Sequence, residues 1–175
     1  QETPPDAGIG AVVELCPDVP PVDLFTFLGG TPATNGTWSP ATMLGGGTFD
    51  PSQDPSGTYT YVVPGSAVCP DASASISVTV GASPFVDVLV TDATCHGISD
   101  GSVVLSSPGG GPVTTTWDDG AEGLHRTGLA AGSYTAMVTS PMGCVSVVNA
   151  VVEEPTALEA GTSVISAICE GASGQ

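Results

Sequence analysis

The sequence predicts an all-β protein made of two antiparallel β-sandwich domains in tandem, and three observations lead to this prediction. A set of Cys, Trp and Tyr landmarks occurs twice in the same order. Short apolar runs alternate with polar residues and are bounded by Gly, Pro, Asp or Asn, which is the pattern of short strands. With Gly 24, Pro 16 and only 5% aromatic residues, the composition favours many turns. No segment shows the 3.6-residue apolar period of a helix.

The landmarks define the repeat, which we sought before assigning any element. Two spacings recur: Cys16 to Trp38 and Cys95 to Trp117 are each 22 positions, and Tyr59 to Cys69 and Tyr134 to Cys144 are each ten. Residues 90–97 also align with 164–171, so a third copy begins there. We therefore predict one module over 1–82, a second over 83–160, and the first strand of a truncated third module over 161–175.

The strands follow from the local patterns. In the first module, we expect strands at 24–28, 58–63 and 73–80, where apolar and polar residues alternate or β-branched residues dominate. In the second module, we expect strands at 85–91, 102–106, 113–117, 133–139 and 145–152. Six or seven short strands in about 75 residues, with frequent turn signals, are typical of an antiparallel β-sandwich.

The cysteines are candidate cross-links. In the chain-entropy model, one pair per module closes a loop of about 50 residues and stabilises the fold by roughly 4 kcal/mol. A small domain with few aromatics needs such a cross-link, because it buries a low fraction of its surface. The alternative, a metal or redox site, lacks a Cys-x-x-Cys spacing. We predict the disulfides Cys16–Cys69 and Cys95–Cys144, with Cys169 unpaired.

The aromatic landmarks have two interpretations. Exposed tryptophans and tyrosines can stack on sugars, but one Trp in the middle strand of a small sandwich is usually buried in the core. A Gly-x-Tyr sequence at the start of a strand also resembles a tyrosine corner. We predict structural core roles for Trp38, Tyr59, Trp117 and Tyr134.

The charge balance excludes several partners. The chain has 175 residues, with 18 acidic residues against a single Arg126 and no lysine, for a net charge of −17. A surface almost without cations cannot neutralise phosphates or anionic lipids, so we expect neither nucleic-acid binding nor membrane insertion. No apolar run approaches the length of a membrane span, and no signal-peptide pattern is present.

The acids also raise the question of calcium, which takes six to eight oxygen ligands. Asp92 and Asp100 flank Cys95, and residues 118–122 form an acidic turn, but the first module has Val13 and Pro21 where the second has Asp92 and Asp100. We expect no cofactor, with Ca²⁺ as the one ion that the sequence leaves open. The acids that adjoin prolines, which are Asp50, Asp54 and Asp71, suit turns better than ligation.

Catalysis has little support. The two histidines, His96 and His125, lie in no recognisable nucleophile motif. A pair of carboxylates facing a cleft is possible in any acidic protein, but nothing in the spacing indicates one. We expect that the chain is not an enzyme.

The second module carries a family resemblance. Its segments are 90–102 (VTDATCHGISDGS), 116–120 (TWDDG), 128–134 (GLAAGSY), Gly143-Cys144 and 154–158 (EPTAL). Together they resemble the SprB-type repeat of large surface adhesins of gliding bacteria, of the Bacteroidetes type. The first module is similar to the Ig-like modules of the same surface proteins. The resemblance implies two Ig-like sandwiches, export to the cell surface, long arrays of modules, and roles in attachment and gliding motility, with no catalytic residue.

These observations favour a non-enzymatic structural or adhesive segment of a secreted or cell-surface repeat protein, either an adhesin stalk or an extracellular filament. Its expected partners are neighbouring modules of the same or identical chains, together with surface glycans. Three alternatives stay open: a glycan-binding module, a Ca²⁺-binding module, and an accessory domain of a secreted hydrolase. In a filament, sheet edges can pair between chains, and residues 161–175 would be the donated strand.

Overall fold

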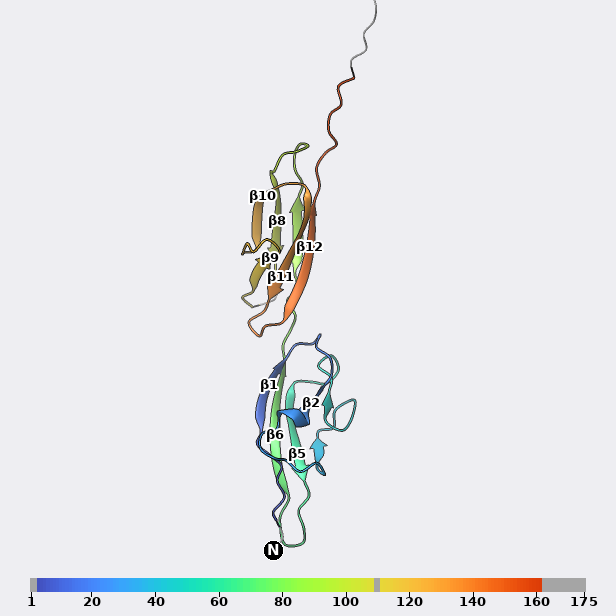
Figure 1. The fold of residues 1–175 in the computed structure, drawn as a ribbon, viewed down its shortest axis with the longest axis vertical. Coiled ribbons are helices and arrows are strands. Elements are labelled where there is room, and N and C mark those ends of the chain that lie inside the picture. The colour runs from blue at the N-terminus through green and yellow to red at the C-terminus, as the bar shows by residue number, and fades with distance from the viewer. Residues whose placement is uncertain (1–2, 109–110, 162–175) are drawn as a thin grey trace, which may run out of the picture.

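The computed structural model describes residues 3–108 and 111–161 and shows two β-sandwiches that lie end to end (Figure 1). Within these residues, strands are joined by turns and irregular loops, and the one helical element is a single 3₁₀ turn. The expected first strand of a third module falls almost entirely on residues 162–175, which lie outside the described residues. The all-β class and the tandem sandwich architecture are confirmed.

The first sandwich is organised around β6 (Ala72–Val80), whose alternate residues are buried. This strand pairs antiparallel with β5 (Gly57–Val63) and parallel with β1 (Ala11–Leu15). The sheet has the order β1-β6-β5-β3, with β3 at Thr37–Ser39, and a small sheet pairs β2 (Val22–Asp23) with β4 (Thr48–Phe49). Among the strands that the structure describes, the parallel β1–β6 pair is the exception to the antiparallel pairing that we expected.

The expected strand at 24–28 is wrong, because Leu24–Phe27 forms the 3₁₀ helix η1. Asp23 caps this turn: its carboxylate accepts a hydrogen bond from the Phe25 backbone N–H at 2.9 Å. The Thr26 hydroxyl also donates to the Asp23 carbonyl at 2.6 Å. These local side-chain bonds satisfy backbone groups that a strand would have paired with a neighbour.

The second sandwich has two three-stranded sheets. One has the order β10-β8-β7, with β7 at Asp87–Thr91, β8 at Gly101–Ser106 and β10 at His125–Leu129. The other has the order β12-β11-β9, with β9 at Thr114–Trp117, β11 at Gly132–Thr139 and β12 at Val145–Val152. All five strands expected here are present within two residues of their predicted bounds, and β10 is an additional one.

Each sandwich has a core of its own. The first core includes Leu24, Phe49, Tyr59 and Ile76, and the second includes Val103, Trp117, Ala136 and Val138, and the two clusters share no residue. Burial of apolar side chains stabilises each sandwich separately by removing their surface from water.

The separate cores make the two sandwiches energetically independent at these positions. Leu24 is 0% exposed, so Leu24→Ala should lower the unfolding free energy of the first sandwich by about 2–5 kcal/mol through the cavity that it leaves. The thermal transition that Trp38 fluorescence reports, measured in a Trp117→Phe background, should fall. The transition that Trp117 reports in a Trp38→Phe background should stay in place, and Val103→Ala should give the reverse pattern. Equal shifts in both transitions would contradict two separate cores.

Candidate functional site

A disulfide joins the two sandwiches. Cys16 follows β1 in the first sandwich, and Cys144 ends the hairpin loop between β11 and β12 in the second. The two sulfurs are bonded, with Cα atoms 5.4 Å apart and 128 positions between them in the sequence. The covalent cross-link therefore spans the joint between modules.

The expected pair Cys16–Cys69 is wrong in this structure, because the two cysteines lie at opposite ends of the first sandwich. Cys16 comes directly after β1, whose last residue pairs with the last residue of β6. Cys69 precedes the first residue of β6. The nine residues of β6 separate its ends by about 26 Å at roughly 3.3 Å per step. A disulfide requires Cα atoms no more than about 7 Å apart.

The expected pair Cys95–Cys144 is wrong for the same reason. Cys144 directly precedes β12, whereas Cys95 lies beyond its far end, where the Ala93 backbone N–H donates to the carbonyl of Glu153 at 2.9 Å. Cys69 is half-buried and Cys95 is exposed, and both are free thiols in this structure. Cys169 lies outside the described residues.

Hydrogen bonds fix the connecting segment on both sides of the joint. The Gly81 N–H donates to the Leu15 carbonyl at 2.8 Å, which holds the segment to the first sandwich. The Ser146 hydroxyl donates to the Pro84 carbonyl at 2.6 Å, which holds it to the second. A Cβ at position 81 would lie 3.0 Å from the Cys144 sulfur, so glycine allows the close approach of the disulfide.

Three of the four aromatic landmarks are built into the sandwiches. Trp117 is buried, and its indole N–H donates to the Gly123 carbonyl at 2.8 Å. Tyr59 is buried and donates to the carbonyl of Pro55, four residues upstream, at 2.9 Å. Tyr134 is half-buried and makes the equivalent bond to the Ala130 carbonyl at 2.9 Å. These bonds have the geometry of the tyrosine corner that is common in immunoglobulin-like sandwiches.

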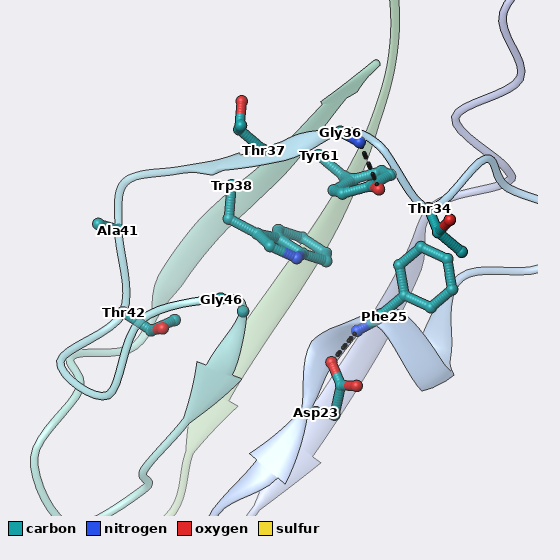
Figure 2. Close-up of a pocket in the computed structure, with 11 residues that line it drawn as sticks. Asp23, Phe25, Thr34, Gly36, Thr37, Trp38, Ala41, Thr42, Gly46 and Tyr61 are labelled. Atoms are coloured by element: carbon teal, nitrogen blue, oxygen red, sulfur yellow. Dashed lines mark hydrogen bonds between the residues drawn. The ribbon is translucent and has the colours of Figure 1, made fainter.

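Trp38 differs from Trp117, because it is only partly buried and lines an open pocket of about 420 Å³. Figure 2 shows its indole beside the rings of Tyr61 and Phe25, with polar side chains around the rim. The Trp38 and Tyr61 ring centroids are 5.1 Å apart, and those of Phe25 and Tyr61 are 5.4 Å apart. Trp38 packs against the first core as predicted, and it also forms a wall of this pocket. The remaining lining includes Asp23, Thr34, Thr37 and Thr42.

Two polar groups of this pocket have no protein partner in the part of the chain that the structure describes. The Thr42 hydroxyl is buried and makes no hydrogen bond. The Trp38 indole N–H also makes none within that part, in contrast to the bonded N–H of Trp117. Gly47 packs against the edge of Trp38, where any Cβ would collide with the indole nitrogen. The pocket therefore combines an aromatic wall with unsatisfied hydrogen-bonding groups.

Most of the acidic side chains noted above cap turns. The Asp50 and Asp71 carboxylates accept backbone N–H bonds within their own loops, as turn chemistry predicts. Asp54 accepts from the Asp50 N–H and, across β4, from the Met43 N–H. Asp92 accepts from the Glu153 N–H at 2.9 Å. The hydroxyl and N–H of Thr94 donate to Asp100 and hold the pKa of that carboxyl below its ordinary value.

The one arginine forms a surface network. Arg126 makes two hydrogen bonds to Asp119, which lower the pKa of that carboxyl, and its guanidinium lies 5.2 Å from the centre of the Trp117 ring. His96 Nδ1 lies 2.8 Å from a Glu154 oxygen at the surface. Over residues 3–108 and 111–161, no three His, Cys, Asp or Glu side chains come together as metal ligands would. No helix in the same residues is long and apolar enough to cross a membrane.

Comparisons with known proteins give distant likenesses. No protein-family model matches the chain, and no curated protein matches its sequence. The chain is similar to murine CEACAM1b, with 13% identity and a TM-score of 0.40, over 81% of this chain and 96% of that one. Two structures of the N-terminal four Ig domains of Dscam1, isoforms 9.44 and 6.9, are each 15% identical. Their TM-scores are 0.37 and 0.33, and the match spans 45% of each of those chains.

The cysteine connectivity can be tested directly. Digestion of the alkylated, non-reduced protein should yield one peptide that links Cys16 to Cys144, with Cys69 and Cys95 carrying the alkyl label. Mass spectrometry before and after reduction identifies the pair. A peptide that links Cys16 to Cys69 would contradict the structure, because these positions lie a whole strand apart.

Proposed function

We propose that the chain is a non-enzymatic structural and adhesive segment of a secreted or cell-surface repeat protein. The observation that carries this proposal is the disulfide across the joint between the two sandwiches. Stable disulfides belong to oxidising compartments outside the cytosol, which supports an extracellular location. A cross-link that fixes one module to the next also serves a spacer, because it controls the direction in which the array extends.

The position of the cross-link determines how the chain carries tension. A pull on the two ends passes along β1 to Cys16, through the disulfide to Cys144, and out along β12. The 128-position loop that the bond closes, which contains nearly all of both sandwiches, is bypassed. The covalent bond therefore protects the residues between Cys16 and Cys144 from being extended, which is the property that a stalk under tension needs.

Charge and sequence resemblance support the same proposal. The net charge of −17 gives the modules a mutually repelling surface that favours extension and solubility. The segments that resemble SprB-type repeats of gliding-bacterial adhesins suggest long arrays at a cell surface. Under this proposal, the described residues are one stretch of such an array, in which attachment and surface movement depend on the whole protein.

The spacer proposal predicts a defined, elongated shape in solution that depends on the disulfide. Small-angle scattering of the oxidised chain should give one narrow set of extended conformers. The double variant Cys16→Ser/Cys144→Ser should show a wider spread of shapes, because only the connecting segment and its hydrogen bonds then link the two sandwiches. Cys69→Ser is the matched control and should behave as the unmodified chain. A compact particle, or no difference between the double variant and the control, would argue against a rigid spacer.

The pocket beside Trp38 supports a second function, the binding of a glycan. Sugars present apolar C–H faces that stack on aromatic rings, together with hydroxyls that pair with polar groups. The half-buried indole provides the aromatic face, and the exposed polar side chains of Asp23 and Thr34 line the same pocket. An adhesive module could use this site to hold a surface polysaccharide.

Binding to a glycan array, followed by titration of the best ligand, tests this second function. Trp38→Ala should weaken binding by about tenfold or more, because the stacking surface and the indole N–H are both lost. Met43→Ala, at an exposed residue outside the pocket lining, should leave the affinity unchanged. The absence of any bound glycan, or equal affinity for both variants, would contradict a sugar site at Trp38.

A further inference from the structure

The free thiol of Cys69 occupies the same structural position as the bonded Cys144. Cys69 lies in the β5–β6 hairpin loop and Cys144 in the β11–β12 hairpin loop. In each loop, a serine N–H donates to the cysteine carbonyl at 2.9 Å, from Ser66 in the first and Ser140 in the second. The cysteine N–H in turn donates to the hydroxyl of that serine, at 3.3 Å and 3.2 Å. The two hairpins therefore hold their cysteines by the same pair of serine bonds, with the serine three positions before Cys69 and four before Cys144.

The free thiol of Cys95 likewise matches the bonded Cys16. Each cysteine follows the first long strand of its sandwich, and each carbonyl accepts from the N–H three residues later, at 3.3 Å from Val19 and 3.2 Å from Ile98. The chain leaving each sandwich is also bonded next to the cysteine. Gly81 pairs with Leu15 in the first sandwich, and Ala93 pairs with Glu153 in the second.

The surroundings of the free thiols repeat those of the joint. At the joint, residues 82–85 and the hairpin residues 140–142 line one groove. At the free end of the first sandwich, residues 3–6 and the hairpin residues 63–66 line a matching groove that includes Cys69. At the free end of the second sandwich, Cys95 lines a groove with the outgoing segment 155–158.

The two free cysteines lie at opposite ends of the molecule. In Figure 1, the β5–β6 loop lies beside the N-terminus at the lower end, and the β7–β8 loop lies at the upper end, where the chain runs out past β12. We call Cys16 and Cys95 first-turn cysteines, because each lies in the turn after the first long strand of its sandwich, and we call Cys69 and Cys144 hairpin cysteines. The observed disulfide joins the first-turn cysteine of one sandwich to the hairpin cysteine of the next. The first sandwich is left with an unused hairpin cysteine, and the second with an unused first-turn cysteine.

We propose that Cys69 and Cys95 are the two complementary halves of the same inter-module disulfide, each bonding to an adjoining sandwich of this repeat type. Cys95 takes a hairpin cysteine of the kind of Cys69 and Cys144, and Cys69 takes a first-turn cysteine of the kind of Cys16 and Cys95. Modules are thereby cross-linked head to tail at every joint. The inference extends the proposed spacer role, on which its biological setting rests, but the pairing chemistry can be tested without it.

The bond forms by thiol–disulfide exchange, so the oxidant is an external disulfide such as oxidised glutathione. One cysteine thiolate attacks the external disulfide and releases one thiol. The second cysteine then attacks the mixed disulfide, forms the protein S–S bond and releases the other thiol. Two protein thiols are oxidised and one external disulfide is reduced to two thiols.

Two single-thiol forms of the full chain provide the test. Cys169→Ser is included in both, one form also carries Cys69→Ser, and the other carries Cys95→Ser. Each retains the Cys16–Cys144 bond and one free terminal cysteine. The two forms, one of them isotopically labelled, are mixed in a glutathione redox buffer at about 1 mM, which approaches the effective concentration of linked modules. Non-reducing mass spectrometry counts the mixed and like dimers, and thermal melting confirms that both forms fold.

Head-to-tail pairing predicts that the mixed Cys69–Cys95 dimer exceeds either like dimer by about tenfold or more. The same mixture in concentrated urea should give the statistical ratio, because the folded ends no longer select the partner. A statistical ratio in the folded mixture, an excess of like dimers, or no cross-linking would each overturn the proposal. The scattering comparison of the Cys16→Ser/Cys144→Ser variant tests the spacer role separately, so failure of one does not entail failure of the other.

Discussion

The architecture depends on one geometric constraint: the last strand of each sandwich holds the two cysteines of that module at opposite ends. A strand of about nine residues spans some 26 Å, whereas a disulfide closes only a few ångströms. No module can therefore close on itself, and each sulfur is available to a neighbour. The Cys16–Cys144 bond, the hydrogen bonds of the connecting segment and the position of Gly81 together form a joint in which both sandwiches are fixed. The sequence carries 18 acidic residues against a single arginine, so charge repulsion between the two modules favours extension.

Much of the fold could be predicted from the sequence, because the period-2 pattern of strands such as 73–80 is a local property of the chain. Residues 24–28 show the limit of this method. Their alternation resembles a strand, but the Asp23 cap stabilises a 3₁₀ turn instead. The disulfide partners were beyond sequence reasoning for a different reason. In a repeat, a first cysteine can pair with the second cysteine of its own module or of the next. Only the strand pairing separates the two cases, through the β1–β6 register in the first sandwich and the Ala93–Glu153 bond in the second.

Trp38 and Trp117 show how one landmark can serve two purposes. Both lie 22 positions after a cysteine and on equivalent strands, yet Trp117 is buried with its N–H satisfied, whereas Trp38 opens onto a pocket. The difference arises in the following loop, where the first module carries three consecutive glycines at 45–47, all with positive φ. The backbone at Gly47 approaches the indole edge more closely than any side chain would allow. The sequence signal of this change is the Trp-to-Tyr spacing, which is 21 positions in the first module and 17 in the second.

The central claim is that a covalent bond across the joint carries tension past both sandwiches. Stretching single chains by their two ends, with and without reductant, tests it most directly. In the oxidised chain, the residues between Cys16 and Cys144 should not extend. Reduction should release these 128 positions, adding a contour length of roughly 420–460 Å at 3.3–3.6 Å per residue. Equal final lengths in the two conditions would show that the bond does not span the sandwiches, and would contradict the account.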